Sequence, residues 1–141
     1  KHTYFMNFYI ASDHAGFLLK KKIIEKLNTL QFNDLGCFSS DSVDYPDYAN
    51  KLCNCIDENS FGILICGTGI GINIAANRHK HIRCALLYNT RCATLAKQHN
   101  NINVIALGAK ETTLEESIDI INTVLNTNFE YGRHLNRINK L

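Results

Sequence analysis

A run of alternating glycines after an apolar segment is the feature that points most directly to chemistry. The segment from Phe61 to Ile65 leads straight into Cys66-Gly67-Thr68-Gly69-Ile70-Gly71. Glycines at alternate positions let the backbone pass close to a ligand with its N–H groups turned inward. A helix predicted directly after the loop adds the positive end of its dipole. The loop is therefore suited to bind a phosphate or another oxyanion.

Two common nucleotide-binding motifs do not fit this loop. A Walker A loop needs Lys-Ser or Lys-Thr after the glycines, and neither follows Gly71. The dinucleotide fingerprint needs its third glycine one residue later and an acidic residue about 20 residues further on. Tight packing between a strand and a helix stays open as a structural explanation of the glycines.

Cys66 lies at the mouth of this loop. Because a helix N-terminus stabilises a thiolate, its thiol is a candidate nucleophile or proton acceptor. A buried, inert cysteine is the alternative. The close pair formed by Cys53 and Cys55 lacks further ligands at zinc-finger spacing, so no metal site is predicted. We interpret the cysteines outside the loop as packing residues: Cys37, Cys53, Cys55, Cys84 and Cys92.

A carboxylate and an imidazole follow the first apolar segment, as Asp13 and His14. Asp13 is also a common type of helix cap, and His14 fits an ordinary surface position equally well. A second imidazole, His99, is followed by Asn100 and lies between a predicted helix and the last predicted strand. Histidine is the side chain best suited to transfer protons near neutral pH.

Arg133 and Arg137 are four residues apart. On a helical turn this spacing puts both guanidinium groups on one face, where they can clamp a phosphate. A solvated helix face is the alternative explanation of the two arginines. None of these motifs decides the function separately.

The elements that must position these residues follow from hydrophobic periodicity. Strands are predicted at 8–11, 32–35, 61–65, 83–87 and 103–107, and helices at 19–30, 48–56, 70–77, 90–98 and 114–125. A polar loop at 39–47 holds the single proline. Apolar strands that alternate with helices favour a parallel sheet covered on both faces. The expected fold is a three-layer α/β/α sandwich with a mostly parallel, Rossmann-like sheet of about five strands.

Length and composition limit the function classes. The 141 residues correspond to one domain, and 45% apolar against 20% charged residues is typical of a globular protein. A formal net charge of +2 does not favour nucleic-acid binding. No apolar run approaches the roughly 20 residues that cross a bilayer, so no membrane partner is expected. Without a recognisable signal peptide, we expect reduced thiols and a cytoplasmic protein.

Six separated motifs occur in one order along nearly the whole chain, and together they resemble the ribose-5-phosphate isomerase B family. That family also holds the subunits of galactose-6-phosphate isomerase and an allose-6-phosphate isomerase. The resemblance implies interconversion of ribose 5-phosphate and ribulose 5-phosphate, a step of the pentose phosphate pathway, through an enediol and without a metal or cofactor. The motifs are Ala11-Ser12-Asp13-His14-Ala15-Gly16, Val43-Asp44-Tyr45-Pro46-Asp47-Tyr48-Ala49, Cys66-Gly67-Thr68-Gly69-Ile70-Gly71, His99-Asn100, Ala106-Leu107-Gly108 and Gly132-Arg133-His134.

The resemblance also implies a role for each matching residue. Cys66 is expected to move the proton between C1 and C2, and His99 to open the furanose ring. The loop N–H groups and the Thr68 hydroxyl are expected to stabilise charge on the carbonyl oxygen. His14, Arg133 and Arg137 are expected to bind the phosphate. The whole expected substrate-binding set is Asp13, His14, Tyr45, Gly67, Gly69, Ile70, Gly71, Asn100, Lys110, Arg133 and Arg137.

Two positions compare informatively with the family pattern. One branch uses a Glu directly after the last loop glycine as its base, whereas this chain has Ile72 there and groups with the cysteine branch. At Lys110 many members carry Arg; lysine keeps the charge but loses the bidentate fork. Because members are dimers or tetramers of dimers with shared pockets, His99, Asn100 and Lys110 are expected to serve the partner's site.

Alternative functions stay open at this stage. The family includes hexose 6-phosphate isomerases, and the sequence does not separate five-carbon from six-carbon substrates. A non-catalytic sugar-phosphate sensor on the same fold would need the phosphate clamp but neither Cys66 nor His99. A thiol redox protein is disfavoured because the sequence contains no C-x-x-C.

Overall fold

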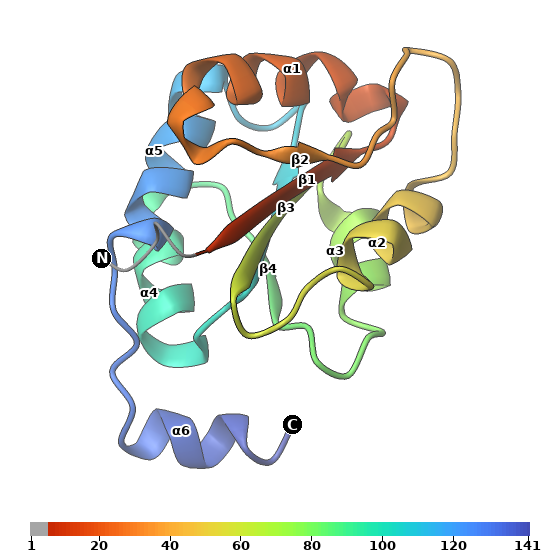
Figure 1. The fold of residues 1–141 in the computed structure, drawn as a ribbon. Coiled ribbons are helices and arrows are strands. Elements are labelled where there is room, and N and C mark those ends of the chain that lie inside the picture. The colour runs from red at the N-terminus through yellow and green to blue at the C-terminus, as the bar shows by residue number, and fades with distance from the viewer. Residues whose placement is uncertain (1–5) are drawn as a thin grey trace.

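A single five-stranded parallel sheet forms the centre of the molecule in the computed structural model, which describes residues 6–141 (Figure 1). The order across the sheet is β2-β1-β3-β5-β4, and every neighbouring pair runs parallel. The expected Rossmann-like, parallel sheet is therefore confirmed. The strands are β1 (Asn7–Ser12), β2 (Asn33–Asp34), β3 (Ser60–Cys66), β4 (Cys84–Leu86) and β5 (Val104–Gly108).

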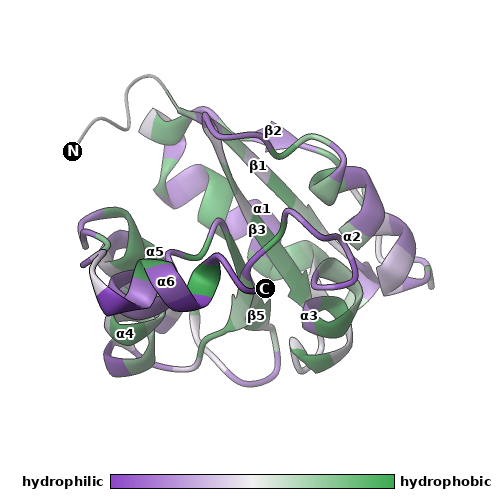
Figure 2. Cartoon of the chain, turned by 90° about the horizontal axis from the view of Figure 1, so that it is seen from below, coloured by the Kyte–Doolittle hydropathy of each residue, from purple (hydrophilic) through white to green (hydrophobic). Residues whose placement is uncertain are grey.

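Helices cover both faces of the sheet and give three layers. One apolar cluster joins the sheet to α1, α4 and α5, and a second joins its other face to α2 and α3. Figure 2 shows hydrophobic strands at the centre, with the hydrophilic segments concentrated on the surrounding helices. The helices are α1 (Phe17–Lys26), α2 (Tyr45–Cys53), α3 (Ile70–Ala76), α4 (Thr90–Asn100), α5 (Leu114–Leu125) and α6 (Arg133–Ile138).

The most central strand, β3, is buried along its whole length. All seven of its residues are buried, since neighbours lie on both of its edges and helices on both of its faces. The helix α6, by contrast, lies away from the sheet and contacts the body through α4 (Figure 1). No helix among residues 6–141 has the length and apolar character needed to cross a membrane.

The strand order reverses between β1 and β3. The chain moves from β1 outward to β2, then returns to add β3 on the other side of β1. Connections that leave a parallel sheet in opposite directions open a crevice beyond the carboxyl ends of the two strands. The segments beginning at Asp13 and at Gly67 follow those two ends, so the fold directs both motifs to the crevice.

Both boundaries of α2 differ from the sequence prediction by three residues. The polar loop was expected to reach residue 47 and the helix to span 48–56, but α2 spans Tyr45–Cys53. Pro46 stands in its first turn, where the missing N–H costs nothing, and Asp47 suits the positive end of the dipole. Proline therefore begins this helix rather than ending the loop.

The predicted helix at 19–30 is divided in two. The helix α1 ends at Lys26, and a separate 3₁₀ turn, η3, spans Asn28–Leu30. Gln31 then adopts a left-handed backbone with φ of 53°. The apolar spacing thus predicted the buried face correctly but not the break between the two helical segments.

A buried ion pair ties α1 to β2. The Lys20 side chain is fully buried, and its ammonium group contacts the Asp34 carboxylate. The ammonium also lies 5.1 Å from the centroid of the Phe38 ring and 5.6 Å from that of Phe17. The same Asp34 oxygen accepts the N–H of Gly36, which directs the chain from β2 into the following loop.

We predict that Asp34→Asn lowers the free energy of unfolding by about 2 kcal/mol, because the Lys20 ammonium then stays buried without its charge partner. The amide oxygen still accepts the Gly36 N–H, so the variant isolates the charge. Lys20→Met, which removes the buried charge altogether, is expected to cost less. Urea titration of both variants measures the difference, and a larger loss in Lys20→Met contradicts the argument.

Candidate active site

The two loops at the strand reversal are held together by backbone contacts. The N–H of Asp13 donates to the carbonyl oxygen of Ile65 at 3.1 Å. Gly16 packs so closely on Ile65 that a Cβ atom built on it would lie 2.7 Å from that same oxygen. Any larger residue at this glycine would push the first loop away from β3. The Asp13 segment and Cys66 therefore share one end of the sheet.

Cys66 ends β3 with its thiol turned into the glycine loop. The residue is 4% exposed, and its Sγ accepts the N–H of Gly69 at 3.2 Å. Within the loop, the Ile70 N–H donates to Thr68 Oγ1 at 3.2 Å. A backbone donor on sulfur stabilises negative charge there, as a proton acceptor requires. The structure thus brings Cys66 and Thr68 together as predicted.

The end of β5 fixes the loop from its other side. The N–H of Ala109 donates to the Cys66 carbonyl, and the N–H of Lys110 to the Gly67 carbonyl, both at 2.9 Å. A Cβ on Gly108 would lie 2.5 Å from the Thr68 backbone, so glycine is required at this close approach. These contacts hold the loop backbone rigidly against the sheet.

Tyr88 adds a contact that the sequence did not indicate. It follows β4, and its hydroxyl donates to the Thr68 carbonyl oxygen at 3.1 Å. Nothing in the residue type or spacing separates it from an ordinary surface tyrosine. Only the position of β4 at the edge next to β5 brings the ring over the loop.

Asp13 and His14 both take defined positions at this end of the sheet. One Asp13 oxygen accepts the N–H of Gly16 at 3.1 Å and caps the 3₁₀ turn η2 (His14–Gly16). Helix capping is the structural role that the sequence leaves open for Asp13, and one of its two carboxylate oxygens has this role. His14 Nδ1 accepts the N–H of Val43 at 3.2 Å, so its neutral ring carries the proton on Nε2.

Lys110 and Tyr45 border the loop. The Lys110 side chain passes over Gly67, where a Cβ atom would lie 3.6 Å from its Cε. The Tyr45 ring covers Gly71, with only 2.6 Å between such a Cβ and the ring carbon Cζ. Within its own chain, Lys110 therefore lies at the same end of the sheet as Cys66, unlike His99, with which it is expected to serve the partner's site.

Four predicted site residues lie at the opposite, amino end of the strands: His99, Asn100, Arg133 and Arg137. Arg83, just before β4, donates from Nε to the Asn100 carbonyl oxygen at 3.1 Å. The N–H of Glu130 donates to the Gln98 carbonyl and joins the segment before α6 to the end of α4. The described chain therefore does not bring these four residues to its own Cys66.

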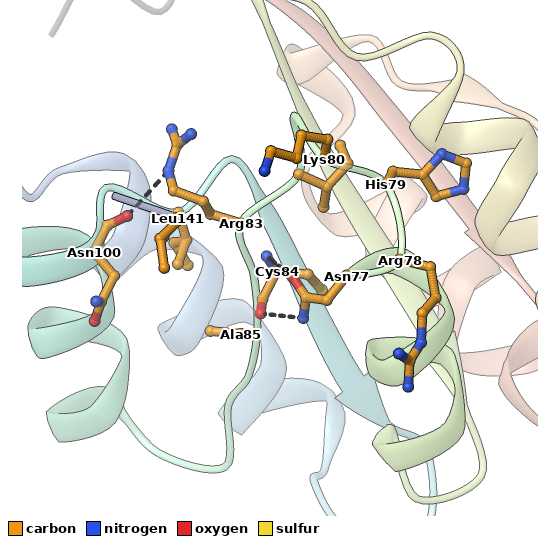
Figure 3. Close-up of a pocket in the computed structure, with 11 residues that line it drawn as sticks. Asn77, Arg78, His79, Lys80, Arg83, Cys84, Ala85, Asn100 and Leu141 are labelled. Carbon is orange, nitrogen blue, oxygen red and sulfur yellow. Dashed lines mark hydrogen bonds between the residues drawn. The ribbon is translucent and has the colours of Figure 1, made fainter. Parts of the chain in front are cut away.

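A cavity of about 450 Å³ opens at this amino end, beside the start of β4 (Figure 3). Asn100 lines it together with several basic residues, among them Arg78, Lys80 and Arg83. Asn77 hydrogen-bonds with the backbone of Cys84 on one wall. The cavity is remote from Cys66 along the strand direction, so it is not the pocket that the glycine loop serves.

His99 belongs to a cluster that the sequence analysis did not assign. Its ring stacks on His134, with centroids 4.2 Å apart and 10° between the planes. Glu130 Oε1 lies 3.8 Å from His99 Nε2 and 3.4 Å from His134 Nε2. Burial lowers the pKa of His134, and the charge of His99 lowers it further. The four-residue spacing of Glu130 and His134 is the only sequence signal for the cluster.

The other cysteines differ from Cys66 in their surroundings. All six are free thiols, and Cys37, Cys53 and Cys84 are buried as expected of packing residues. Burial raises the pKa of Cys53 to about 12 and raises that of Cys84 as well. Cys55 and Cys92 are only half-buried, so the packing interpretation is incomplete for them.

Comparison with known sequences identifies the family. The sequence profile of the family described as Ribose/Galactose Isomerase matches residues 8–141. The chain belongs to this family. It is 47% identical to the probable ribose-5-phosphate isomerase B of Mycoplasma genitalium over 141 residues, which cover 96% of this chain and 93% of the relative.

Solved structures of the family share this fold. Ribose 5-phosphate isomerase B of Thermotoga maritima superposes with a TM-score of 0.92 at 45% identity and 96% coverage of both chains. The Mycoplasma genitalium enzyme, solved with bound ribulose-5-phosphate, gives a TM-score of 0.86 at 45% identity, covering 96% of this chain and 93% of that one. The three-layer fold with its parallel sheet is thus the fold of this isomerase family.

The loop geometry predicts opposite tolerances at two of its glycines. Gly69 has φ of 81°, and a Cβ there would lie 2.4 Å from Leu86 Cδ1. Gly69→Ala is therefore expected to lose about 1–2 kcal/mol of stability from the left-handed backbone alone, and more from the clash. Gly67→Ala meets only ordinary contacts of 3.6–3.7 Å and is expected to be nearly neutral.

Thermal unfolding of the two glycine variants against the parent chain measures this difference. Equal melting temperatures for the two variants would show that the loop backbone at Gly69 is not constrained as the structure describes.

Proposed function

We propose that this chain is an aldose–ketose isomerase that interconverts ribose 5-phosphate and ribulose 5-phosphate. The observation that carries the proposal is the buried Cys66 thiol, which accepts a backbone N–H inside a glycine loop at the strand reversal. Family membership and the ribulose-5-phosphate complex of a relative support the choice of substrate. The reaction belongs to the pentose phosphate pathway. We propose a cytoplasmic site of action, since phosphorylated sugars are metabolised inside cells.

The proton transfer between C2 and C1 is assigned to Cys66. The thiolate removes the C2 proton of the open aldose, and electrons move through a C1–C2 double bond to the carbonyl oxygen. Loop N–H groups and the Thr68 hydroxyl stabilise the charge on that oxygen. A proton then passes from the C2 hydroxyl to the C1 oxygen, and the same sulfur returns its proton to C1, which leaves a carbonyl at C2 and completes the ketose. Because the chain supplies both the base and the charge stabilisation, the mechanism needs no metal.

Substrate binding is shared among the remaining residues at the same end of the sheet. The second oxygen of Asp13 accepts hydrogen bonds from sugar hydroxyls. His14 presents its Nε2 proton to the phosphate, since Nδ1 is occupied by Val43. Lys110 adds positive charge from its place over Gly67. Tyr45 closes the pocket on the side of Gly71, and the N–H groups of Gly67, Gly69, Ile70 and Gly71 line the loop.

The residues at the amino end of the strands enter through a second subunit. His99 takes the proton of the anomeric hydroxyl and returns one to the ring oxygen, which opens the furanose. Asn100 contacts the sugar, and Arg133 and Arg137 on α6 bind the phosphate. The separation of this set from Cys66 within one chain supports a dimer, or a tetramer of dimers, with shared pockets.

Replacement of the proposed base tests the chemistry. Cys66→Ala is expected to lower the turnover of ribose 5-phosphate by roughly 10²- to 10⁴-fold, the usual contribution of a general base. Calorimetric binding of inorganic phosphate is expected to survive, because the phosphate contacts are elsewhere. The matched control is Cys92→Ala, which removes a half-buried thiol from α4 and is expected to retain turnover.

The assay is run with a chelator present and with galactose 6-phosphate as a second substrate. Turnover of ribose 5-phosphate by Cys66→Ala at the parent rate would disprove the assignment of the base. Conversion of the hexose phosphate alone would replace the proposed substrate.

A mixing experiment tests the shared pocket. Cys66→Ala and His99→Asn are each expected to be inactive as pure proteins. After the two are unfolded and refolded together, hybrid dimers contain one pocket with an intact Cys66 and an intact His99 from different chains. Mixed samples are expected to regain about a quarter of the parent activity through random pairing.

If each pocket were built from one chain, no hybrid would hold an intact pair and the mixture would stay inactive. Size-exclusion chromatography of the mixture confirms that dimers have reformed before the activity is compared.

A further inference from the structure

Three side chains that suit metal ions meet where α4 and α6 approach each other. His99 comes from the last turn of α4, His134 from the start of α6, and Glu130 from the segment before α6. One ligand atom from each lies within 4.8 Å of the other two. The N–H of Glu130, bonded to the Gln98 carbonyl at 3.0 Å, fixes the backbone of this segment against α4.

The inner member of the cluster is buried without a hydrogen-bond partner. His134 is 7% exposed, and its Nε2 forms no hydrogen bond among residues 6–141. The nearest charged oxygen, Glu130 Oε1, lies 3.4 Å away in a contact that does not meet hydrogen-bond geometry. A buried polar atom left unpaired costs free energy, so the structure holds an unsatisfied nitrogen that faces two further ligands.

The spacing is near that of a tetrahedral metal site. Bonds of about 2.0–2.2 Å from zinc to nitrogen and oxygen place neighbouring ligand atoms roughly 3.3–3.5 Å apart. Glu130 Oε1 lies 3.4 Å from His134 Nε2 and 3.8 Å from His99 Nε2. The side chains of His99 and Glu130 are 39% and 48% exposed, so both can turn toward the fixed His134.

We propose that His99, Glu130 and His134 bind one divalent transition-metal ion of the zinc type, with a fourth position open to water or a ligand oxygen. Two imidazole nitrogens favour zinc-like ions over magnesium and calcium, which take oxygen ligands. The positive charges of Arg133 and Arg137, which are close enough to influence His134, oppose a cation and weaken its binding.

The bound ion inhibits the isomerase, a consequence that rests on the proposed function. Metal coordination takes the Nε2 lone pair of His99 and holds its ring on the ion, whereas the ring-opening step needs an imidazole that is free to accept and return a proton. The stacked rings must also separate as His99 turns toward the ion. Zinc and the cyclic sugar phosphate therefore compete for one histidine.

Metal binding is tested first, without any assay of turnover. Isothermal calorimetry with Zn²⁺ is expected to give one ion per chain for the parent protein. Glu130→Gln is expected to weaken Zn²⁺ binding at least about tenfold. Loss of a residue that only positions a metal ligand already lowers the metal affinity by about this factor. Glu130 is half-exposed, so this variant is expected to fold.

His79→Asn is the matched control. It removes an imidazole whose Nε2 already bonds to Asn50 Oδ1 at 2.7 Å, far along the chain from the cluster. Its Zn²⁺ affinity is expected to equal that of the parent. Parent-like affinity in Glu130→Gln, or no Zn²⁺ binding by the parent, would overturn the site.

Cobalt identifies the ligand atoms. Co²⁺ bound at two histidines and a carboxylate is expected to give visible bands without a thiolate-to-metal charge-transfer band. A charge-transfer band would place the metal on a cysteine such as Cys66 and would refute the proposal.

Inhibition is then measured with ribose 5-phosphate. Rising Zn²⁺ is expected to stop turnover in the parent, a chelator to restore it, and Glu130→Gln to need at least about ten times more Zn²⁺. Zinc binding without inhibition would overturn the regulatory role alone. Absence of turnover in the parent would refute the proposed function and leave the calorimetric result standing.

Discussion

The contact of the glycine loop with the end of β5 is the constraint on which the site depends. The loop backbone lies so close to β5 that no side chain fits at Gly108. Backbone bonds from Ala109 and Lys110 then fix the carbonyls of Cys66 and Gly67. With these groups held, the Gly69 N–H is aimed at the Cys66 sulfur. The orientation of the thiol is therefore a property of the sheet rather than of the loop sequence alone.

Much of the fold could be predicted because its signals are local. Buried strands such as β3 are continuous apolar runs, and α5, with its capping box at Thr113 and Glu116, was predicted with its observed bounds of Leu114–Leu125. Boundaries failed where local rules compete. Pro46 fits both a loop and a first helical turn, and the apolar spacing runs through the break after Lys26. Only packing against the sheet decides between such alternatives.

The candidate site could be predicted in part for the same reason. Asp13 and Cys66 follow strands, and parallel strands bring their carboxyl ends together by topology. The contacts of Tyr88 and Glu130 could not be predicted in this way, because they depend on which elements are neighbours in space. The position of Lys110 over Gly67 follows from the turn after β5, which no local sequence pattern indicates. A single sequence also cannot say which side chains a second subunit supplies.

The bond from the Val43 N–H to His14 Nδ1 has a consequence for molecular recognition. A backbone donor fixes the tautomer of the ring, so the outward nitrogen is a directional donor in the neutral state. A group that binds this nitrogen must offer a lone pair. An ammonium or another N–H group cannot bind there, even where it would fit sterically. The imidazole thus discriminates by the polarity of a hydrogen bond, and it needs no net charge of its own to do so.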